Sequence, residues 1–132
     1  EGLVQARWVE SEPISLAITV LTSMSAEDLS KTGVTRSVTD QVLTLAKQAK
    51  EAGLSGVVAS PQEAAMLREI LGPNAYIVTP GVRPAGSDLG DQSRVATPKE
   101  AFDNGASHIV IGRPITGQAD PGAAFDAIVK EL

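Results

Sequence analysis

The chain has 132 residues, of which 42% are hydrophobic, and this is enough for one domain with a substantial core. Its net charge of −5 argues against general nucleic-acid binding. The absence of cysteine excludes disulfides and thiolate metal sites, and a single histidine cannot build a multi-histidine metal site. No run approaches the ~18 apolar residues needed to cross a membrane, and the first residues do not resemble a signal peptide. We therefore expect a cytoplasmic protein without a membrane partner.

Short apolar runs alternate with helical patterns along the whole chain. Residues 1–12 resemble the tail of a preceding helix. The apolar runs predict four strands, at Ile14–Leu21, Gly56–Ala59, Tyr76–Val78 and His108–Ile111. The patterns between and after them predict helices at 40–52, 61–71, 98–105 and from 121 onward. This alternation implies a parallel sheet, whose strands are commonly buried on both faces.

Several helix starts carry capping signals. Ser60-Pro61-Gln62-Glu63 and Thr97-Pro98-Lys99-Glu100 both have the pattern of a capping box with proline at the first helical position. Ser25 with Asp28 predicts a short helical turn, and Asp120 predicts the start of the last helix. Capping is a sufficient explanation for Ser60, Glu63 and Asp120, so these three are not candidates for chemistry.

Four βα units in one α/β domain of 132 residues have the size of half a (β/α)8 TIM-type barrel, whose full length is about 250 residues. A small, open, four-stranded sheet is the alternative. The half-barrel is favoured because the helices leave one element uncovered at the N-terminus. It is also favoured because the polar loops follow the last two strands, where such barrels often bind phosphate.

Two of the predicted strands end at glycine and arginine. The run to Val78 leads to Gly81 and Arg83, and the run to Ile111 leads to Gly112 and Arg113. Glycine lets backbone N–H groups approach a ligand, and the arginine guanidinium matches a phosphate with a fork of donors. Surface salt bridges would explain one such arginine. Two of them at corresponding strand ends predict an anion site, with the long loop 79–96 beside it.

Five sequence blocks occur together and in one order. They are Thr19-Val20-Leu21-Thr22-Ser23-Met24, Gly56-Val57-Val58-Ala59-Ser60-Pro61-Gln62-Glu63-Ala64, Val78-Thr79-Pro80-Gly81-Val82-Arg83-Pro84, Gly90-Asp91-Gln92-Ser93-Arg94-Val95 and Ile111-Gly112-Arg113-Pro114-Ile115-Thr116. This set resembles the orotidine 5′-phosphate decarboxylase family. The resemblance covers strands five to eight of the family's barrel. The family's catalytic Asp-x-Lys-x-x-Asp motif is absent, because no lysine here has aspartate two residues before and three after it.

The resemblance implies a reaction and a role for each of several residues. The family converts orotidine 5′-monophosphate to UMP and CO₂, in de novo pyrimidine synthesis, without cofactor or metal. It implies no catalytic residue in this chain, only residues that bind the substrate. In that reading Arg113 and Gly112 bind the 5′-phosphate, Gln92 closes over it, Arg83 lies at the loop base and Thr22 faces the ribose. Ser23 or Ser25 is a weaker candidate for the pyrimidine edge.

Three hypotheses follow for the chain. The first is the phosphate-binding half of the decarboxylase, natural, cleaved or engineered, which is inactive until a missing N-terminal half-barrel joins it. The second is a non-catalytic half-barrel that assembles with a second copy of itself and binds phosphate or nucleotide. The third is a related reaction, such as that of the 3-keto-gulonate phosphate decarboxylases, against which the Thr-Pro-Gly-Val-Arg-Pro and Gly-Asp-Gln blocks argue.

Overall fold

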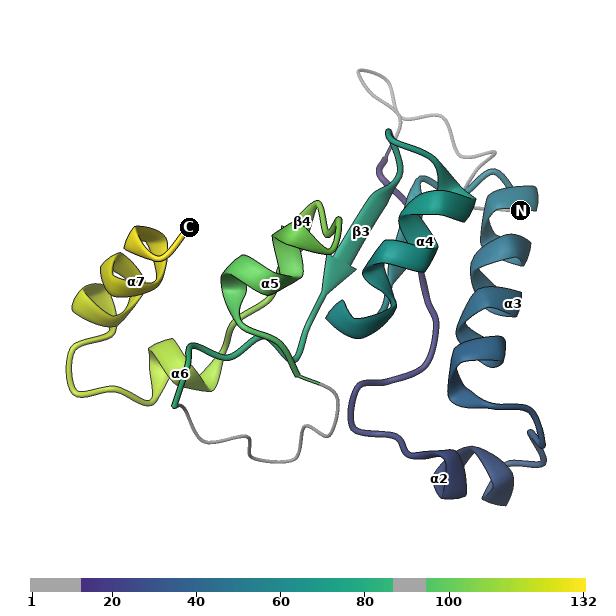
Figure 1. The fold of residues 1–132 in the computed structure, drawn as a ribbon, viewed down its shortest axis with the longest axis horizontal. Coiled ribbons are helices and arrows are strands. Elements are labelled where there is room, and N and C mark those ends of the chain that lie inside the picture. Colours follow the sequence, from purple (N-terminus) through teal and green to yellow (C-terminus); the bar gives the residue numbers. More distant parts are fainter. Residues whose placement is uncertain (1–12, 87–94) are drawn as a thin grey trace.

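A computed structural model describes residues 13–86 and 95–132 of the chain, and it contains one parallel sheet (Figure 1). The strands are β1 (Leu16–Ile18), β2 (Gly56–Val58), β3 (Tyr76–Thr79) and β4 (His108–Ile109). Their order in the sheet is β1-β2-β3-β4, and every pair is parallel. The predicted α/β class and the four strands are confirmed. The helix predicted at residues 1–12 lies outside the described residues.

The helices follow the predicted order with one addition. They are α2 (Ala26–Lys31), α3 (Val38–Glu51), the 3-10 helix η1 (Pro61–Glu63), α4 (Ala64–Leu71), α5 (Pro98–Asp103), α6 (Arg113–Thr116) and α7 (Pro121–Lys130). The four-residue helix α6 was not predicted, because the apolar run before it suggested that β4 extends to Ile111. None of the described helices is long and apolar enough to cross a membrane.

The capping predictions are confirmed at three of four sites. Ser25 with Asp28 and Thr97 with Glu100 form reciprocal capping boxes, and Asp120 caps α7. Ser60 also caps, but its hydroxyl accepts from the Gln62 N–H, as the tighter 3-10 turn requires. The helix predicted as one piece from residue 61 therefore begins as η1 and continues as α4.

The two outer strands are shorter than predicted. β1 keeps three of the eight residues in the run Ile14–Leu21, and β4 keeps two of the four in His108–Ile111. Each has a neighbour on one side only, so fewer ladder hydrogen bonds define its ends. The central strands β2 and β3 lie within one residue of their predicted bounds.

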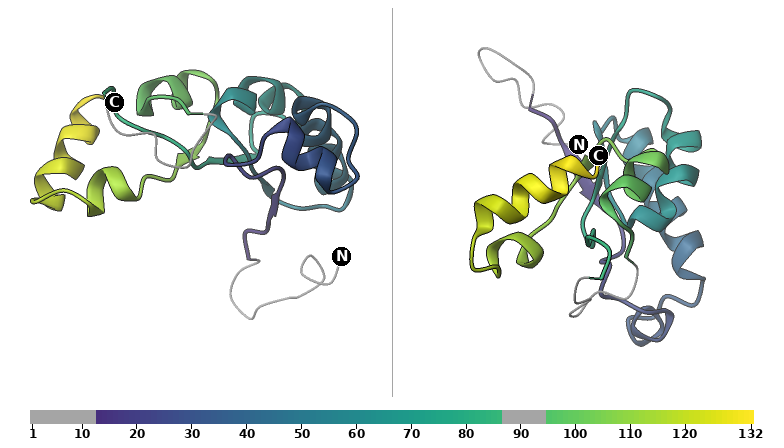
Figure 2. Two further views of the ribbon diagram at one scale, coloured as in Figure 1. Left: turned by 90° about the horizontal axis from the view of Figure 1, so that it is seen from below. Right: turned by 60° about the vertical axis from the view of Figure 1, so that its left-hand side comes forward.

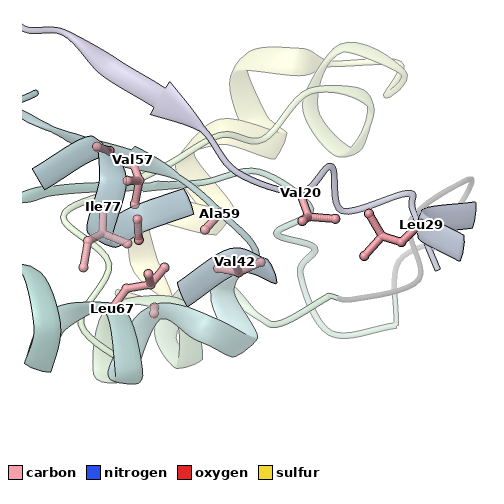
Figure 3. Close-up of a cluster of buried hydrophobic side chains, with 10 residues drawn as sticks. Val20, Leu29, Val42, Val57, Ala59, Leu67 and Ile77 are labelled. Atoms are coloured by element: carbon pink, nitrogen blue, oxygen red, sulfur yellow. The ribbon is translucent and has the colours of Figure 1, made fainter. Parts of the chain in front are cut away.

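One face of the sheet is buried under the helices. Val57 and Ile77 of the central strands are fully buried, and they lie with Leu67 of α4 and Val42 of α3 in one core (Figure 3). Val20 and Leu29 extend this core toward α2. A second, smaller cluster joins α5 to the last strand and contains Val82, Ala101 and Ala106.

The opposite face of the sheet is open, so the expectation that the strands are buried on both faces is wrong for the described chain. Side chains on this face alternate with the core residues, and Ile18 is 65% exposed while Val110, just beyond β4, is 50% exposed. Tyr76 and His108 stack here with ring centroids 5.7 Å apart. Parallel sheets are normally covered on both sides, so an apolar open face departs from the usual arrangement.

The helices that connect strands pack against the strand that follows them. α3 packs on β1 and β2, α4 on β3 and α5 on β4. The last helix, α7, differs because its main contact is with α6. Figure 2 shows α3, α4 and α5 in one layer against the strands, with α7 set apart from that layer.

Arg68 on α4 ties two loops together at the N-terminal end of the sheet. Its Nε and Nη2 donate to the Gly105 carbonyl at 3.1 and 2.8 Å. Its Nη1 lies 2.9, 3.1 and 2.8 Å from the carbonyl oxygens of Gly72, Pro73 and Ala75. One guanidinium therefore holds the end of α4, the turn into β3 and the turn into β4.

The capping boxes predict how stability responds to acid. The Thr97 backbone N–H donates to the Glu100 carboxylate at 2.8 Å, and this lowers the pKa of Glu100 below its ordinary value of 4.5. A lowered folded-state pKa adds stability above the unfolded pKa, and this stability disappears as pH falls through the folded value. The Glu100→Gln variant cannot titrate, so its melting temperature should fall less than that of the wild type between pH 5 and 3. Parallel slopes in thermal melts would contradict the prediction.

Candidate functional site

After β3 the polypeptide turns sharply, and the start of the long loop then pairs with its end. Gly81 has φ +77°, a left-handed conformation that favours glycine. Val82 then pairs in parallel with Ala96, and the Arg83 N–H donates to the Ala96 carbonyl at 2.9 Å. The two ends of the long loop are therefore fastened together at the carboxyl end of β3.

Arg83 is buried where this loop begins. Its side chain is 8% exposed, and Nη1 donates to the Val82 carbonyl at 3.0 Å. A hollow of about 200 Å³ adjoins it, lined by Arg83, Pro84, Ala85, Gly86, Val95, Ala96, Thr97 and Glu100. A buried guanidinium beside a hollow can hold an anion there, because its donors are already oriented by the fold.

Gly112 and Arg113 follow the neighbouring strand. Val78 pairs with His108 and Thr79 with Ile109, so the segments after β3 and β4 leave the sheet at the same edge. The Gly112 carbonyl accepts from the N–H groups of Ile115 and Thr116 at 2.8 and 3.0 Å and so begins α6. Arg113 is exposed. A β-carbon placed on Gly112 would meet no atom within 4 Å, so the packing of the chain alone does not require glycine at this position.

Thr22 lies after β1, at the other side of the sheet. It occupies a turn closed by the Met24 N–H donating to the Leu21 carbonyl at 2.9 Å, and it is buried. Three strand spacings of ~4.8 Å separate β1 from β4, or about 14 Å along the sheet. Thr22 and Arg113 therefore follow strands at opposite edges of the described sheet.

Two further candidates have different outcomes. Gln92 lies outside the described residues, so its placement stays a prediction. The hydroxyl of Ser25 is hydrogen-bonded to the Asp28 carboxylate at 2.7 Å, in the capping box of α2. The capping box therefore accounts for the position of the Ser25 hydroxyl in this structure.

The structure adds Thr97 and Glu100 to the surroundings of Arg83. Both line the hollow, but their capping box is enough to explain their presence in the sequence. No other sequence feature indicated that they lie beside Arg83. Within the described residues, no group of three or more His, Cys, Asp or Glu side chains is placed to hold a metal ion. Chemically, the two guanidinium groups of Arg83 and Arg113 are of the kind that can bind an anionic ligand.

Comparison with known proteins shows which family the chain resembles. The family described as orotidine 5′-phosphate decarboxylase / HUMPS matches residues 2–128. A protein of Pseudoalteromonas atlantica named orotidine 5′-phosphate decarboxylase is 55% identical over 128 residues, which cover 97% of this chain and 54% of that protein. A protein of the same name from Moorella thermoacetica is 57% identical over 91% of this chain and 48% of its own length.

A solved structure agrees with these sequence matches. The crystal structure of orotidine 5′-phosphate decarboxylase from Lactobacillus acidophilus aligns with a TM-score of 0.78 and 43% identity, over 98% of this chain and 54% of that one. The chain thus spans about half the length of the relatives that it matches, in agreement with half of a TIM-type barrel. It belongs to the orotidine 5′-phosphate decarboxylase / HUMPS family.

Proposed function

We propose that this chain is the phosphate- and ribose-binding half of an orotidine 5′-phosphate decarboxylase. The observation that carries the proposal is the arrangement of Arg83 and the Gly112–Arg113 pair. They follow neighbouring parallel strands at one edge of the sheet, in a chain that matches this family along almost its whole length. The enzyme would convert orotidine 5′-monophosphate to UMP and CO₂.

Each site residue has a defined task in this proposal. The Arg113 guanidinium binds the 5′-phosphate, and the Gly112 N–H approaches the same oxygens. Arg83 holds the base of the loop, from which Gln92 contacts the phosphate. Thr22, across the sheet, faces the ribose. Phosphate is remote from the bond that breaks, so its binding energy serves to orient the reacting end.

The chemistry itself requires residues outside this chain. Loss of CO₂ leaves a carbanion at C6 of the pyrimidine, and the family's Asp-x-Lys-x-x-Asp motif stabilises and protonates it. That motif is absent here. The chain alone should therefore bind UMP or phosphate weakly and catalyse nothing.

Reconstitution tests the proposal. This chain is purified and mixed with a separately produced N-terminal half of the Pseudoalteromonas atlantica relative, and the loss of orotidine 5′-monophosphate absorbance is followed. We expect no turnover by either half and turnover by the mixture. The control is the same half with the lysine of its Asp-x-Lys-x-x-Asp motif replaced by alanine. A 1:1 complex that binds UMP without turnover would contradict the enzyme assignment.

The open sheet face favours a second candidate function. Ile18 and Val110 expose apolar surface on that face, and two copies could cover it by closing an eight-stranded dimer. Such a dimer would bind phosphate or nucleotide without catalysis. A concentration-dependent rise in mass to twice that of the chain, together with UMP binding, would support this alternative.

Gly112 provides a prediction that separates binding from folding. Open space surrounds the position of its absent β-carbon, so Gly112→Ala should leave the melting temperature of the isolated chain unchanged within about 2 °C. The methyl group would stand where the phosphate approaches, so UMP affinity of the reconstituted complex should fall, which titration calorimetry measures. Equal UMP affinities of variant and wild type would show that Gly112 does not contact the phosphate.

A further inference from the structure

One side chain in the turn after β2 is explained neither by capping nor by the core. Pro61 and Glu63 are buried, so the 3-10 helix η1 is held firmly against the rest of the chain. Ser60, which is also buried, accepts a hydrogen bond from the Gln62 N–H at 3.2 Å. Gln62 itself is exposed. Its backbone therefore serves the cap, whereas its side chain extends from a fixed turn.

This side chain contacts the end of the long loop, 33 residues later in the sequence. The Nε2 atom of Gln62 donates to the Val95 carbonyl at 3.5 Å. The helix η1 also contacts α5, which begins at Pro98, three residues after Val95. A hydrogen bond of 3.5 Å between exposed groups is long and contributes little to stability. Its contribution is to fix the position of the Val95 carbonyl relative to the end of β2.

The position of Val95 matters because the next residue holds the backbone of Arg83. The Ala96 carbonyl accepts from the Arg83 N–H at 2.9 Å, and Ala96 pairs with Val82. Val95 and Arg83 also line the same hollow of about 200 Å³. Because Arg83 is buried, the place of its guanidinium depends on where this backbone is held. A short path of hydrogen bonds therefore links the Gln62 side chain to Arg83.

We propose that Gln62 is a positioning residue of the anion site, which holds the Val95 carbonyl and thereby the backbone from which Arg83 extends. The inference rests on the proposed function, in which Arg83 lies at the base of the loop beside the phosphate. Gln62 touches no ligand in this proposal. Its effect should therefore be confined to the phosphate end of the ligand and should spare the contacts of the nucleoside.

Amide exchange in the isolated chain tests the contact without any ligand. The Arg83 N–H is the reporter, because it donates to the Ala96 carbonyl. Gln62→Ala should raise its exchange rate roughly 2- to 10-fold, the factor that one hydrogen bond between neutral groups contributes. Gln48→Ala removes another exposed glutamine, on α3, and should leave this rate unchanged. Both variants should keep the wild-type melting temperature within about 3 °C, because neither side chain is buried.

Two ligands that differ only in the phosphate test the consequence for binding. UMP and uridine are titrated into the complex with the N-terminal half of the Pseudoalteromonas atlantica relative, and binding is followed by NMR. Gln62→Ala and Gln62→Glu should each weaken UMP binding roughly 2- to 10-fold and leave uridine binding unchanged. Glutamate has the length of glutamine, but its carboxylate cannot donate to the Val95 carbonyl. Gln48→Glu adds the same charge on α3 and is the control.

The two measurements separate this inference from the proposed function. An unchanged Arg83 exchange rate in Gln62→Ala would overturn the inference. Equal losses of UMP and uridine affinity, together with a lower melting temperature, would also overturn it, because they indicate a general loss of structure. If the complex binds no UMP, the proposed function fails. Faster exchange of Arg83 in Gln62→Ala would in that case still show that Gln62 holds the Arg83 backbone.

Discussion

Arg113→Ala in the reconstituted complex should weaken UMP binding roughly 10- to 100-fold, because a hydrogen bond to a charged group contributes about 1.5–3 kcal/mol. Arg113 is exposed, so its replacement should not disturb the core of the chain. A planar guanidinium can hold two phosphate oxygens at once, which a lysine cannot reproduce with the same geometry. Arg113→Lys should therefore recover only part of the affinity.

The kinetic effect should exceed a simple loss of substrate binding. If phosphate binding orients the reacting end, kcat should fall together with kcat/KM. Lys47→Ala removes one positive charge from an exposed position in the middle of α3 and serves as the control, with values near those of the wild type. Equal affinities of Arg113→Ala and Lys47→Ala for UMP would exclude Arg113 from phosphate binding.

Arg68→Leu should be the most destabilising single substitution on the surface of this chain, with a loss of about 2–4 kcal/mol in the free energy of unfolding. The guanidinium donates to carbonyls of two separate turns, including Gly105 at 2.8 Å and Ala75 at 2.8 Å. Leucine keeps the bulk of the stem but leaves these carbonyls without that donor. Chemical denaturation monitored by circular dichroism measures the difference.

Arg36 offers a matched control for this substitution. Its Nη1 makes an exposed hydrogen bond of 2.9 Å to the Thr44 hydroxyl, so Arg36→Leu should change stability by less than about 0.5 kcal/mol. Arg68→Lys should fall between wild type and Arg68→Leu, because one ammonium group cannot reach the carbonyls of both turns as the guanidinium does. If Arg68→Leu and Arg36→Leu had the same free energy of unfolding, water would be replacing the hydrogen bonds of Arg68 without any loss of stability.

The sequence was sufficient to predict those parts of the fold that local chemistry determines. Alternating apolar runs predicted the sheet, and capping residues such as Ser25 and Thr97 predicted helix starts. The ends of β1 and β4 could not be predicted, because pairing and not composition decides where an edge strand stops. The tight turn at Ser60 and the short helix at Arg113 also depend on neighbours that local patterns do not encode.

The candidate site was predictable to a similar extent. The repeated glycine and arginine at strand ends indicated an anion site, and parallel pairing of β3 and β4 explains why these ends meet at one edge. The burial of Arg83 and its hollow bordered by Thr97 and Glu100 were not predictable, since they arise from the pairing of Val82 with Ala96. No local pattern links residues fourteen positions apart in this way.

That pairing also affects how freely the loop can change in length. Because Val82 and Ala96 are held together by the fold, the intervening segment is a closed loop. The entropy of closing a flexible loop grows only with the logarithm of its length, so doubling it costs about 0.6 kcal/mol. Insertions and deletions between Pro84 and Val95 should therefore have little effect on the sheet. In evolution or in protein engineering, the length of this segment can therefore change while the strands on either side of it stay the same.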